Sequence, residues 1–258
     1  MSFKIVILAR NELSARYIIE ALDPSIHVEK IVLDPGPDRK KLFIKRIKRI
    51  GILSFFGQLL FRFLVMPYLN SRSKKRKKEL SDTYLKSRPK APLPPVVRVE
   101  NINSEKGSNL LNETEPNAIV VVTRRIISKA TLNRVPRAFI NIHDGIVPKY
   151  RGLFGAYWAM TEKDLEHCGA TVHFIDAGLD TGPIIGQSNI VDGLTDEDNF
   201  TTYPIHQLAS ALPLLNQGLL DMANNRLKTM PRPADVGKIR FGPTLWTYLA
   251  NRIGKGIK

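Results

Sequence analysis

Three polar side chains with complementary chemistry occur within one region of the chain. Asn141 and His143 are separated by a single residue, and Asp180 follows further along, in Leu-Asp-Thr-Gly-Pro. An amide can donate a hydrogen bond to a developing oxyanion, an imidazole can donate or shuttle a proton, and a carboxylate can orient that imidazole or take a proton from an amine. The trio therefore supplies the groups needed to move an acyl group from one amine to another.

The trio belongs to a longer pattern with compatible spacing. Its fixed positions are Asn141, His143, Pro148, Gly169, Thr171, His173, Asp180 and Gly182. The pattern resembles that of the folate-dependent formyltransferases, which transfer a formyl group from 10-formyltetrahydrofolate to a primary amine. The resemblance covers residues 112–190, and it implies that Asn141, His143 and Asp180 are catalytic.

The resemblance also implies a donor site. The stretch Val-Val-Thr-Arg-Arg-Ile-Ile-Ser, residues 121–128, is similar to the family's pterin-side loop. Backbone groups there are expected to contact the pterin edge, and aliphatic side chains its faces. A second loop, from Asp176 to Gly182, is expected to close the pocket. The donor-site residues implied in this way are Arg124, Arg125, Ile126, Ile127, Leu132, Asp176 and Gly178, and no metal ligands are expected.

The acceptor side is expected to include Arg10, Asn11 and His173. The turn that holds Arg10 and Asn11 lacks a Gly-x-Gly-x-x-Gly fingerprint, so a nicotinamide or flavin cofactor has no support. It also lacks the glycine-containing phosphate loop of the glycinamide ribonucleotide branch, although Ser14 could cap the next helix and offer its N-terminus to an anion. His173 has an equal alternative interpretation, as a strand histidine whose ring the backbone satisfies.

The acceptor itself is predicted partly by elimination. The tRNA-directed members of the family carry a separate C-terminal β-barrel, for which residues 231–258 are too few, so no nucleic-acid partner is expected. A small-molecule amine, most simply an amino sugar linked to a nucleotide, is the leading prediction. Two alternatives stay open: a glycinamide ribonucleotide formyltransferase with an unusual phosphate loop, and a folate-binding homologue without catalysis. The oligomeric state is not predicted.

Buried strands must position these residues. Apolar-rich stretches predict strands at 3–9 and 28–33, and a continuous apolar run predicts one at 118–122. A further strand at 138–142 would carry Asn141 and His143 to its carboxyl end. The β-α-β opening predicts an α/β fold with a doubly wound, mostly parallel sheet of the Rossmann-like formyltransferase type, in which ligands gather at the carboxyl ends of the strands. The remaining predicted elements are helices at 14–22 and 204–224 and strands at 171–175 and 184–190.

The net charge of +15 indicates a basic insertion in this fold. Residues 39–90 hold seventeen of the 39 lysines and arginines and two of the 24 acids, which leaves the rest of the chain neutral. The predicted organisation is a catalytic domain at 1–38 and 91–230, the insertion at 39–90 and a tail at 231–258. The apolar stretch 51–66 inside the insertion falls short of the ~20 residues that a membrane span needs, so a transmembrane helix is not expected.

Three interpretations of the insertion stay open. It could be a helical pair that packs on the sheet domain with its charges solvated. It could instead be a basic amphipathic surface that makes a peripheral contact with an anionic membrane through 39–78. Nonspecific attraction to nucleic acid is third.

Cys168, the only cysteine, suits the reducing cytoplasm, and the run Ile5–Ala9 is too short for a secretory signal. The expected location is therefore the cytoplasm, at the inner face of the membrane if the second interpretation holds.

Overall fold

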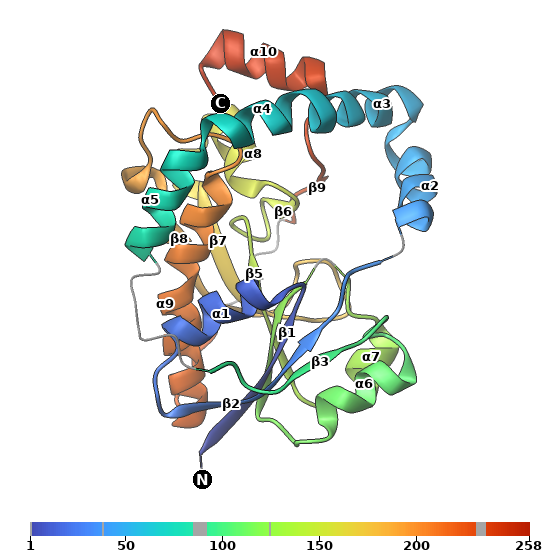
Figure 1. Ribbon diagram of the computed structural model, residues 1–258, viewed down its shortest axis with the longest axis vertical. Coiled ribbons are helices and arrows are strands. Elements are labelled where there is room, and N and C mark those ends of the chain that lie inside the picture. Colours follow the sequence, from blue (N-terminus) through green and yellow to red (C-terminus); the bar gives the residue numbers. More distant parts are fainter. Residues whose placement is uncertain (1, 38, 85–91, 124, 231–235) are drawn as a thin grey trace.

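A seven-stranded sheet forms the centre of the described part of the protein. The structure is a computed structural model that describes residues 2–37, 39–84, 92–123, 125–230 and 236–258 (Figure 1). The strand order is β3-β2-β1-β4-β5-β7-β8, with β1 to β5 parallel and β7 and β8 antiparallel. The strands are β1 (Phe3–Ala9), β2 (Ile26–Leu33), β3 (Val96–Arg98), β4 (Ala118–Val122), β5 (Ala138–His143), β7 (Gly169–Phe174) and β8 (Ile184–Asn189). The predicted doubly wound, mostly parallel α/β fold is confirmed.

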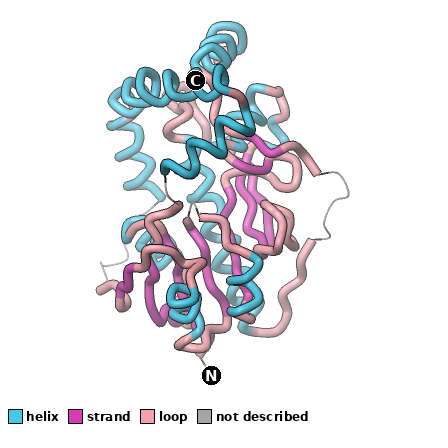
Figure 2. Tube along the Cα trace, turned by 90° about the vertical axis from the view of Figure 1, so that its right-hand side faces the viewer, coloured by secondary structure: helices cyan, strands magenta, loops and turns pink. Residues whose placement is uncertain are grey.

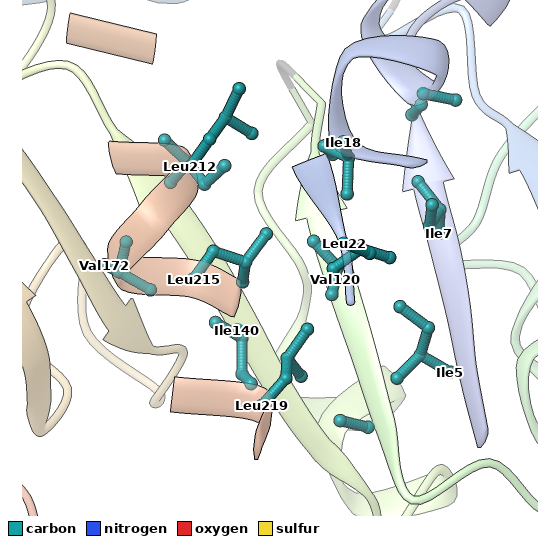
Figure 3. Close-up of a cluster of buried hydrophobic side chains, with 14 of the residues drawn as sticks. Ile5, Ile7, Ile18, Leu22, Val120, Ile140, Val172, Leu212, Leu215 and Leu219 are labelled. Atoms are coloured by element: carbon teal, nitrogen blue, oxygen red, sulfur yellow. The ribbon is translucent and has the colours of Figure 1, made fainter. Parts of the chain in front are cut away.

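Alternation along the strands explains why the sheet is covered on both faces. In β1, Ile5 and Ile7 enter one hydrophobic cluster, whereas Val6 and Leu8 enter another on the opposite face. Figure 3 shows the first cluster, in which Leu215 and its neighbours pack against the sheet. The helices that cover the sheet are α1 (Glu12–Ala21) and α9 (Tyr203–Ala223) on the first face and α6 (Glu105–Asn112) and α7 (Lys129–Arg134) on the second.

The start of the first helix differs from the sequence prediction. Helix α1 begins at Glu12, and Asn11 is its N-cap, because the Asn11 side-chain oxygen accepts the Ser14 N–H at 2.9 Å. Ser14 therefore lies inside the first turn and does not cap the helix. Asn and Ser are both favoured at this position, so the residue types alone did not distinguish them.

The basic insertion folds as a series of helices. They are α2 (Arg39–Ile50), α3 (Ile52–Leu60), α4 (Met66–Arg72) and α5 (Lys74–Tyr84), with a π-helical turn at Phe61–Val65 that joins α3 to α4. The resulting helix, Ile52–Arg72, has 21 residues and is long and apolar enough to cross a membrane by length and composition alone. The expectation of a stretch too short to span is thus wrong, because the helix continues through residues 67–72. The same length and composition also suit a helix that packs on a soluble domain.

One side of this helix packs on the rest of the protein. Phe61 contacts Phe200 and Tyr248, with ring centroids 5.0 Å apart in both pairs. A Cβ added at Gly57 would lie 2.3 Å from the Trp246 ring, so a larger residue here would force the ring to move. Trp246 and Tyr248 belong to α10 (Leu245–Lys255), which lies alongside helix 52–72 at the end of the molecule opposite the N-terminus (Figures 1 and 2).

The insertion and α10 share a second hydrophobic core. Its buried members are Phe61, Leu69, Tyr150, Ala156, Tyr157, Ala159, Met160, Cys168, Ile190, Phe200, Tyr203 and Tyr248. Several come from α8 (Gly155–Thr161) and its flanks. The interpretation of the insertion as packed helices therefore holds for its inner side, although the partner is this second core and α10 more than the sheet itself. Nearby, β6 (Arg151–Gly152) and β9 (Ile239–Arg240) form a small two-stranded sheet.

Candidate active site

Strand β5 carries Asn141 and His143 on the same face, opposite to the face on which Ile140 and Ile142 enter the first hydrophobic cluster. His143 is the last residue of the strand and is buried, with 6% of its surface exposed. Because β1, β4 and β5 are parallel neighbours, their carboxyl ends lie on one edge of the sheet. That edge is the predicted ligand site of this fold class.

His143 is held between a carbonyl and a carboxylate. Its Nε2 lies 3.0 Å from the backbone oxygen of Tyr150, and its Nδ1 lies 3.5 Å from Oδ1 of Asp180. Since a carbonyl oxygen can only accept a hydrogen bond, Nε2 must carry a hydrogen. A second proton, on Nδ1, would point toward Asp180. The Nε2 contact therefore orients the ring so that Nδ1 faces the carboxylate.

Asp180 is held in place by a backbone N–H of Gly152 and by an unusual backbone conformation of its own. Its Oδ2 accepts the Gly152 N–H at 2.9 Å, and its φ of 52° lies in the left-handed region, which is uncommon for a residue with a side chain. Arg151 donates from Nε to the Leu179 carbonyl at 2.7 Å and so ties the Asp180 loop to β6. Strained backbone that is over-determined by its surroundings is frequent at functional sites.

Asn141 is oriented by His173. The Asn141 amide nitrogen lies 3.2 Å from Nε2 of His173, and Nδ1 of His173 lies 2.8 Å from the Phe174 carbonyl oxygen. Nδ1 is therefore the donor to that carbonyl, and Nε2 accepts from the amide. Burial lowers the pKa of His173, and the nearby His143 adds to this effect, which agrees with a neutral ring. One amide N–H of Asn141 is engaged in this way, and the second can donate to a ligand.

His173 thus lies behind Asn141, with both ring nitrogens engaged and 2% of its surface exposed. Of its two sequence interpretations, the backbone-satisfied strand histidine describes its position, with the added function of orienting Asn141. The ring centroids of His143 and His173 are 6.2 Å apart. The structure therefore brings Asn141, His143, His173 and Asp180 into one group.

The predicted donor loop holds side chains of different kinds. Arg124 lies outside the described residues. The Arg125 guanidinium donates to Asp34 at 2.6 Å and to the Glu100 carbonyl at 3.0 Å, so it binds the end of β2. Ile127 is buried in the second-face cluster, and Leu132 packs against it. Ile126, by contrast, is 66% exposed.

Asn103 braces this loop and was not predicted. Its side chain donates to the Ile126 carbonyl and accepts from the Ser128 N–H, each at 2.9 Å. It also accepts from the Thr131 hydroxyl at 2.9 Å. Asp34, buried under Arg125, was likewise missed, although an acid directly after a buried strand of a parallel sheet is a signal that could have identified it.

The loop between β7 and β8 is shaped by its own polar groups. Asp176 accepts the Gly178 N–H at 2.9 Å and the Thr181 hydroxyl at 2.7 Å. These contacts give Asp176 and Gly178 a role in the loop conformation that holds Asp180. Arg10 and Asn11 lie after β1, on the same sheet edge as His143, where Arg10 is exposed. No group of three or more metal-ligating side chains occurs in the described part of the chain.

A cluster of arginines around Phe241 was also not predicted. The guanidinium groups of Arg46 and Arg49 lie 5.4 and 5.0 Å from the centre of the Phe241 ring. Burial lowers the pKa of Arg46, and the positive charge of Arg62 lowers it further. Nε of Arg46 is buried and has no hydrogen-bond partner.

The small sheet connects this arginine cluster to the catalytic group. Arg240, the residue before Phe241, pairs with Gly152, and Gly152 binds Asp180. An open hollow of about 230 Å³ lies beside this strand and is lined by Trp158, Glu162, Lys238, Ile239, Arg240 and Phe241. Arg240 itself is neutralised by Glu162, with N–O distances of 2.6 and 2.8 Å.

Comparison with known families places this geometry in context. The family model described as "Formyl transferase" matches residues 69–203, just over half of the chain, and the matched stretch includes Asn141, His143 and Asp180. The chain belongs to the formyl transferase family. A methionyl-tRNA formyltransferase from Thermodesulfovibrio yellowstonii is 31% identical over 155 residues, covering 58% of this chain and 47% of the relative. One from Kosmotoga olearia is 26% identical over 219 residues, covering 84% and 65%. The first of these matches thus spans about half the length of the relative.

Solved structures of family members share the fold. A sugar N-formyltransferase from a Shewanella species has a TM-score of 0.57 at 14% identity, covering 93% of this chain and 77% of that one. Glycinamide ribonucleotide transformylase 1 from Symbiobacterium toebii has a TM-score of 0.55 at 17% identity, covering 92% and 94%. At such identities the likeness concerns the formyl transferase fold alone.

Proposed function

We propose that this protein transfers a formyl group from 10-formyltetrahydrofolate to a primary amine. The observation that carries the proposal is the position of His143 between the Tyr150 carbonyl and the Asp180 carboxylate, with Asn141 two residues earlier on the same face of β5. An amide donor, a proton carrier and a carboxylate on one sheet edge are the groups that acyl transfer between amines requires.

Each residue then has a definite task. The folate donor supplies the formyl carbon and the leaving nitrogen, which departs with the electron pair of the broken C–N bond and takes up a proton. Asn141 donates its second amide N–H to the negative charge that develops on the formyl oxygen. His143, protonated at Nδ1 beside Asp180, delivers that proton to the leaving nitrogen. Asp180 takes the proton that the attacking amine loses as the new C–N bond forms, so the proton count balances.

The loop after β4 fits a planar donor. Ile126 is exposed while the residues around it are held by Asn103 and by the core, which leaves an apolar side chain and a fixed backbone open to a ring. We expect Ile126→Asp to weaken the binding of 5-formyltetrahydrofolate, an unreactive mimic of the donor, at least tenfold in titration calorimetry. Val96→Asp, at another exposed apolar position, should leave that affinity unchanged. Equal affinities of the two variants would remove Ile126 from the donor site.

We also propose the domain organisation that the sequence indicated, with a catalytic domain at 1–38 and 91–230, an insertion at 39–90 and a tail at 231–258. In support, helices α2 to α5 lie between β2 and β3, two neighbouring strands of one sheet. The boundaries proposed between these parts include residues 38, 90, 91 and 231, which lie outside the described residues. The lone, buried Cys168 suits the cytoplasm, where we place the protein.

For the acceptor, we propose an amino sugar that carries phosphate, as a nucleotide-linked sugar does. Support comes from Arg46 and Arg49 over Phe241 and from the nearby Arg62, for which no carboxylate partner is found among the described residues. Guanidinium groups bind phosphate oxygens in fixed geometry. The cluster is connected to Asp180 through paired strands β9 and β6, so one ligand could place a phosphate at the arginines and an amine at the catalytic group.

Substitution of the arginines tests this acceptor. Arg46→Gln with Arg49→Gln should raise KM for a nucleotide-linked amino sugar at least tenfold and change kcat much less, because the pair binds the substrate away from the reacting atoms. Lys106→Gln with Lys228→Gln removes two exposed positive charges elsewhere and should leave KM unchanged. An unchanged KM in the arginine variant would exclude the cluster as the phosphate site.

Methionyl-tRNA is a second candidate acceptor, favoured by the names of the sequence relatives and by the net charge of +15. Product analysis by mass spectrometry decides between them. The protein is incubated with 10-formyltetrahydrofolate and, separately, nucleotide-linked amino sugars, glycinamide ribonucleotide and methionyl-tRNA. Formylation of the amino sugar supports the proposal, and formylation of either other acceptor replaces it. If the folded protein formylates none of the three acceptors, transfer to these amines is contradicted.

A further inference from the structure

The outer side of the insertion carries an apolar surface that the rest of the described chain leaves uncovered. On helix 52–72, Ile52 and Leu53 are 74% and 71% exposed, and Ile253 of α10 is 82% exposed. We call this surface the apolar platform, and its members are Ile52, Leu53, Phe56, Phe63, Leu64 and Tyr68 of helix 52–72 and Trp246, Leu249 and Ile253 of α10. Large apolar side chains exposed together on two helices that contact each other mark an interaction site in a soluble protein.

The platform is a distinct side of its helix. Phe61 and Leu69 face the second core, Gly57 faces the Trp246 ring, and all three are buried, while Phe56, Phe63 and Leu64 are exposed. The membrane contact expected through 39–78 is narrowed accordingly, because the apolar residues of this helix are not all exposed. Phe56 and Phe63 are exposed, whereas Phe55 packs on Phe43 at 5.3 Å and Leu59 and Leu60 are half-buried. One side of the helix thus packs against the protein, and the other side is exposed to solvent.

Positive charges lie at both ends of the platform helix. Lys48 precedes it at the end of α2, and Arg72, Lys74 and Lys75 follow it. All four side chains are exposed. The neighbouring Arg76 differs, since it is held by the buried Asp198 at 2.8 Å and supports the fold. An apolar face with lysines and arginines along its margins is the arrangement that binds at the headgroup boundary of an anionic bilayer.

We propose that the apolar platform docks on an anionic lipid surface, with helix 52–72 and α10 lying in the plane of that surface. The two helices contact each other at one end of the molecule, which allows both to approach the same surface (Figure 1). Burying several large apolar side chains and placing bases near phosphate headgroups both favour this contact, at about 1 kcal/mol per base near the surface.

Charge argues against a second copy of the chain as the occupant. Two platforms brought face to face would also bring together two insertions that each hold the whole net positive charge of the protein, and like charges placed opposite one another cost free energy. Packing argues against a membrane span. To cross a bilayer, helix 52–72 would have to leave Phe200, Tyr248 and Trp246, which cover its inner side.

Cosedimentation of the full-length protein with vesicles tests the proposal. We expect binding to vesicles of phosphatidylcholine with phosphatidylglycerol, weaker binding as salt rises, and little binding to phosphatidylcholine alone. The salt effect follows because screening shortens the electrostatic range from about 10 Å at 0.1 M salt to about 3 Å at 1 M. Equal binding to both kinds of vesicle, or none to either, would overturn the proposal.

Two variants separate the apolar and the charged contributions. Phe63→Gln with Leu64→Gln should lower the vesicle partition coefficient at least tenfold, and so should Lys74→Glu with Lys75→Glu. The matched controls are Leu13→Gln with Val96→Gln, which change exposed apolar residues elsewhere, and Lys106→Glu with Lys228→Glu. Thermal melting verifies that each variant is folded. Controls that lose binding as strongly as the platform variants would contradict a defined surface.

Two further measurements address the other occupants. Sedimentation velocity without lipid should show a protein whose association state Phe63→Gln with Leu64→Gln leaves unchanged. A self-association that this variant abolishes would assign the platform to a second copy. Vesicle-bound protein should be released by high salt or alkaline carbonate, and protein that resists both would be spanning the bilayer.

Discussion

Alanine at Asn141, His143 or Asp180 is expected to lower kcat for formyl transfer by about 10²–10³-fold, the loss typical of removing one donor to a developing oxyanion. The free energy of unfolding should change little, because these side chains lie at or beside the carboxyl end of β5 and are not members of the hydrophobic clusters. The measurement is kcat with 10-formyltetrahydrofolate and the amine found by product analysis. His167→Ala, which removes a histidine paired with Asp164 instead, is the matched control and should retain activity.

The double variants distinguish shared from independent action. Asn141, His143 and Asp180 would act on one transition state, so combining two substitutions should cost less than the product of the two single losses. Rates that multiply would mean that the residues act separately. His173→Ala should give a smaller loss than Asn141→Ala, since it frees the Asn141 amide to rotate without removing it.

The second large effect is expected far from the catalytic group, at Asp198. This carboxylate is 3% exposed and binds Arg76 of α5 at 2.8 Å and His206 of α9 at 3.0 Å. Asp198→Ala leaves the arginine without its buried partner, and breaking such a pair costs about 3–5 kcal/mol. Urea denaturation should therefore show a large drop in the free energy of unfolding, whereas the exposed neighbour Asp196→Ala should have little effect.

The pH dependence of this effect has a definite sign. Burial alone would raise the pKa of Asp198, but hydrogen bonds from His206 and Arg76 outweigh it and hold the pKa well below its usual range. A carboxylate whose pKa is lowered on folding contributes stability above its unfolded pKa of about 3.9, and that contribution is lost as the pH falls through the folded value. The gap in free energy of unfolding between the wild type and Asp198→Asn should be widest near neutral pH and narrow below about pH 4. A gap independent of pH would exclude the ionised carboxylate as its source.

The strands were predictable because their sequences satisfy one physical demand. Residues 118–122 are buried on both faces for most of their length, a condition that a continuous apolar run meets, and in 138–142 only Asn141 of the candidate site interrupts such a run. The packing of the insertion was not predictable in the same way. Phe61 and Tyr248 are far apart in the sequence, and nothing in the local pattern around either residue indicates the other. The exposed side of helix 52–72 could be identified only once its inner partner was known.

The candidate site divides along a similar line. Asn141, His143 and Asp180 were identified as candidates from residue types and spacing, because the type of a residue determines the functional group that its side chain carries. The Tyr150 carbonyl that orients His143 is a backbone group, which any residue could supply, and therefore leaves no such signal. For the donor loop, the sequence pattern did not distinguish Ile126, which is exposed, from Ile127, which is buried, because adjacent aliphatic residues in a turn look alike before their directions are known.

The contact between helix 52–72 and α10 also has a consequence for biosynthesis. A ribosome produces Gly57 and Phe61 long before Trp246 and Tyr248, so the inner side of the apolar helix has no α10 to cover it during most of translation. Transiently exposed apolar surface promotes aggregation of nascent chains. Until α10, the last helix of the described chain, has been synthesised, chaperones or a lipid surface would protect this segment. Ribosome-stalled chains ending before residue 245 should be more sensitive to protease within residues 52–72 than chains that include α10.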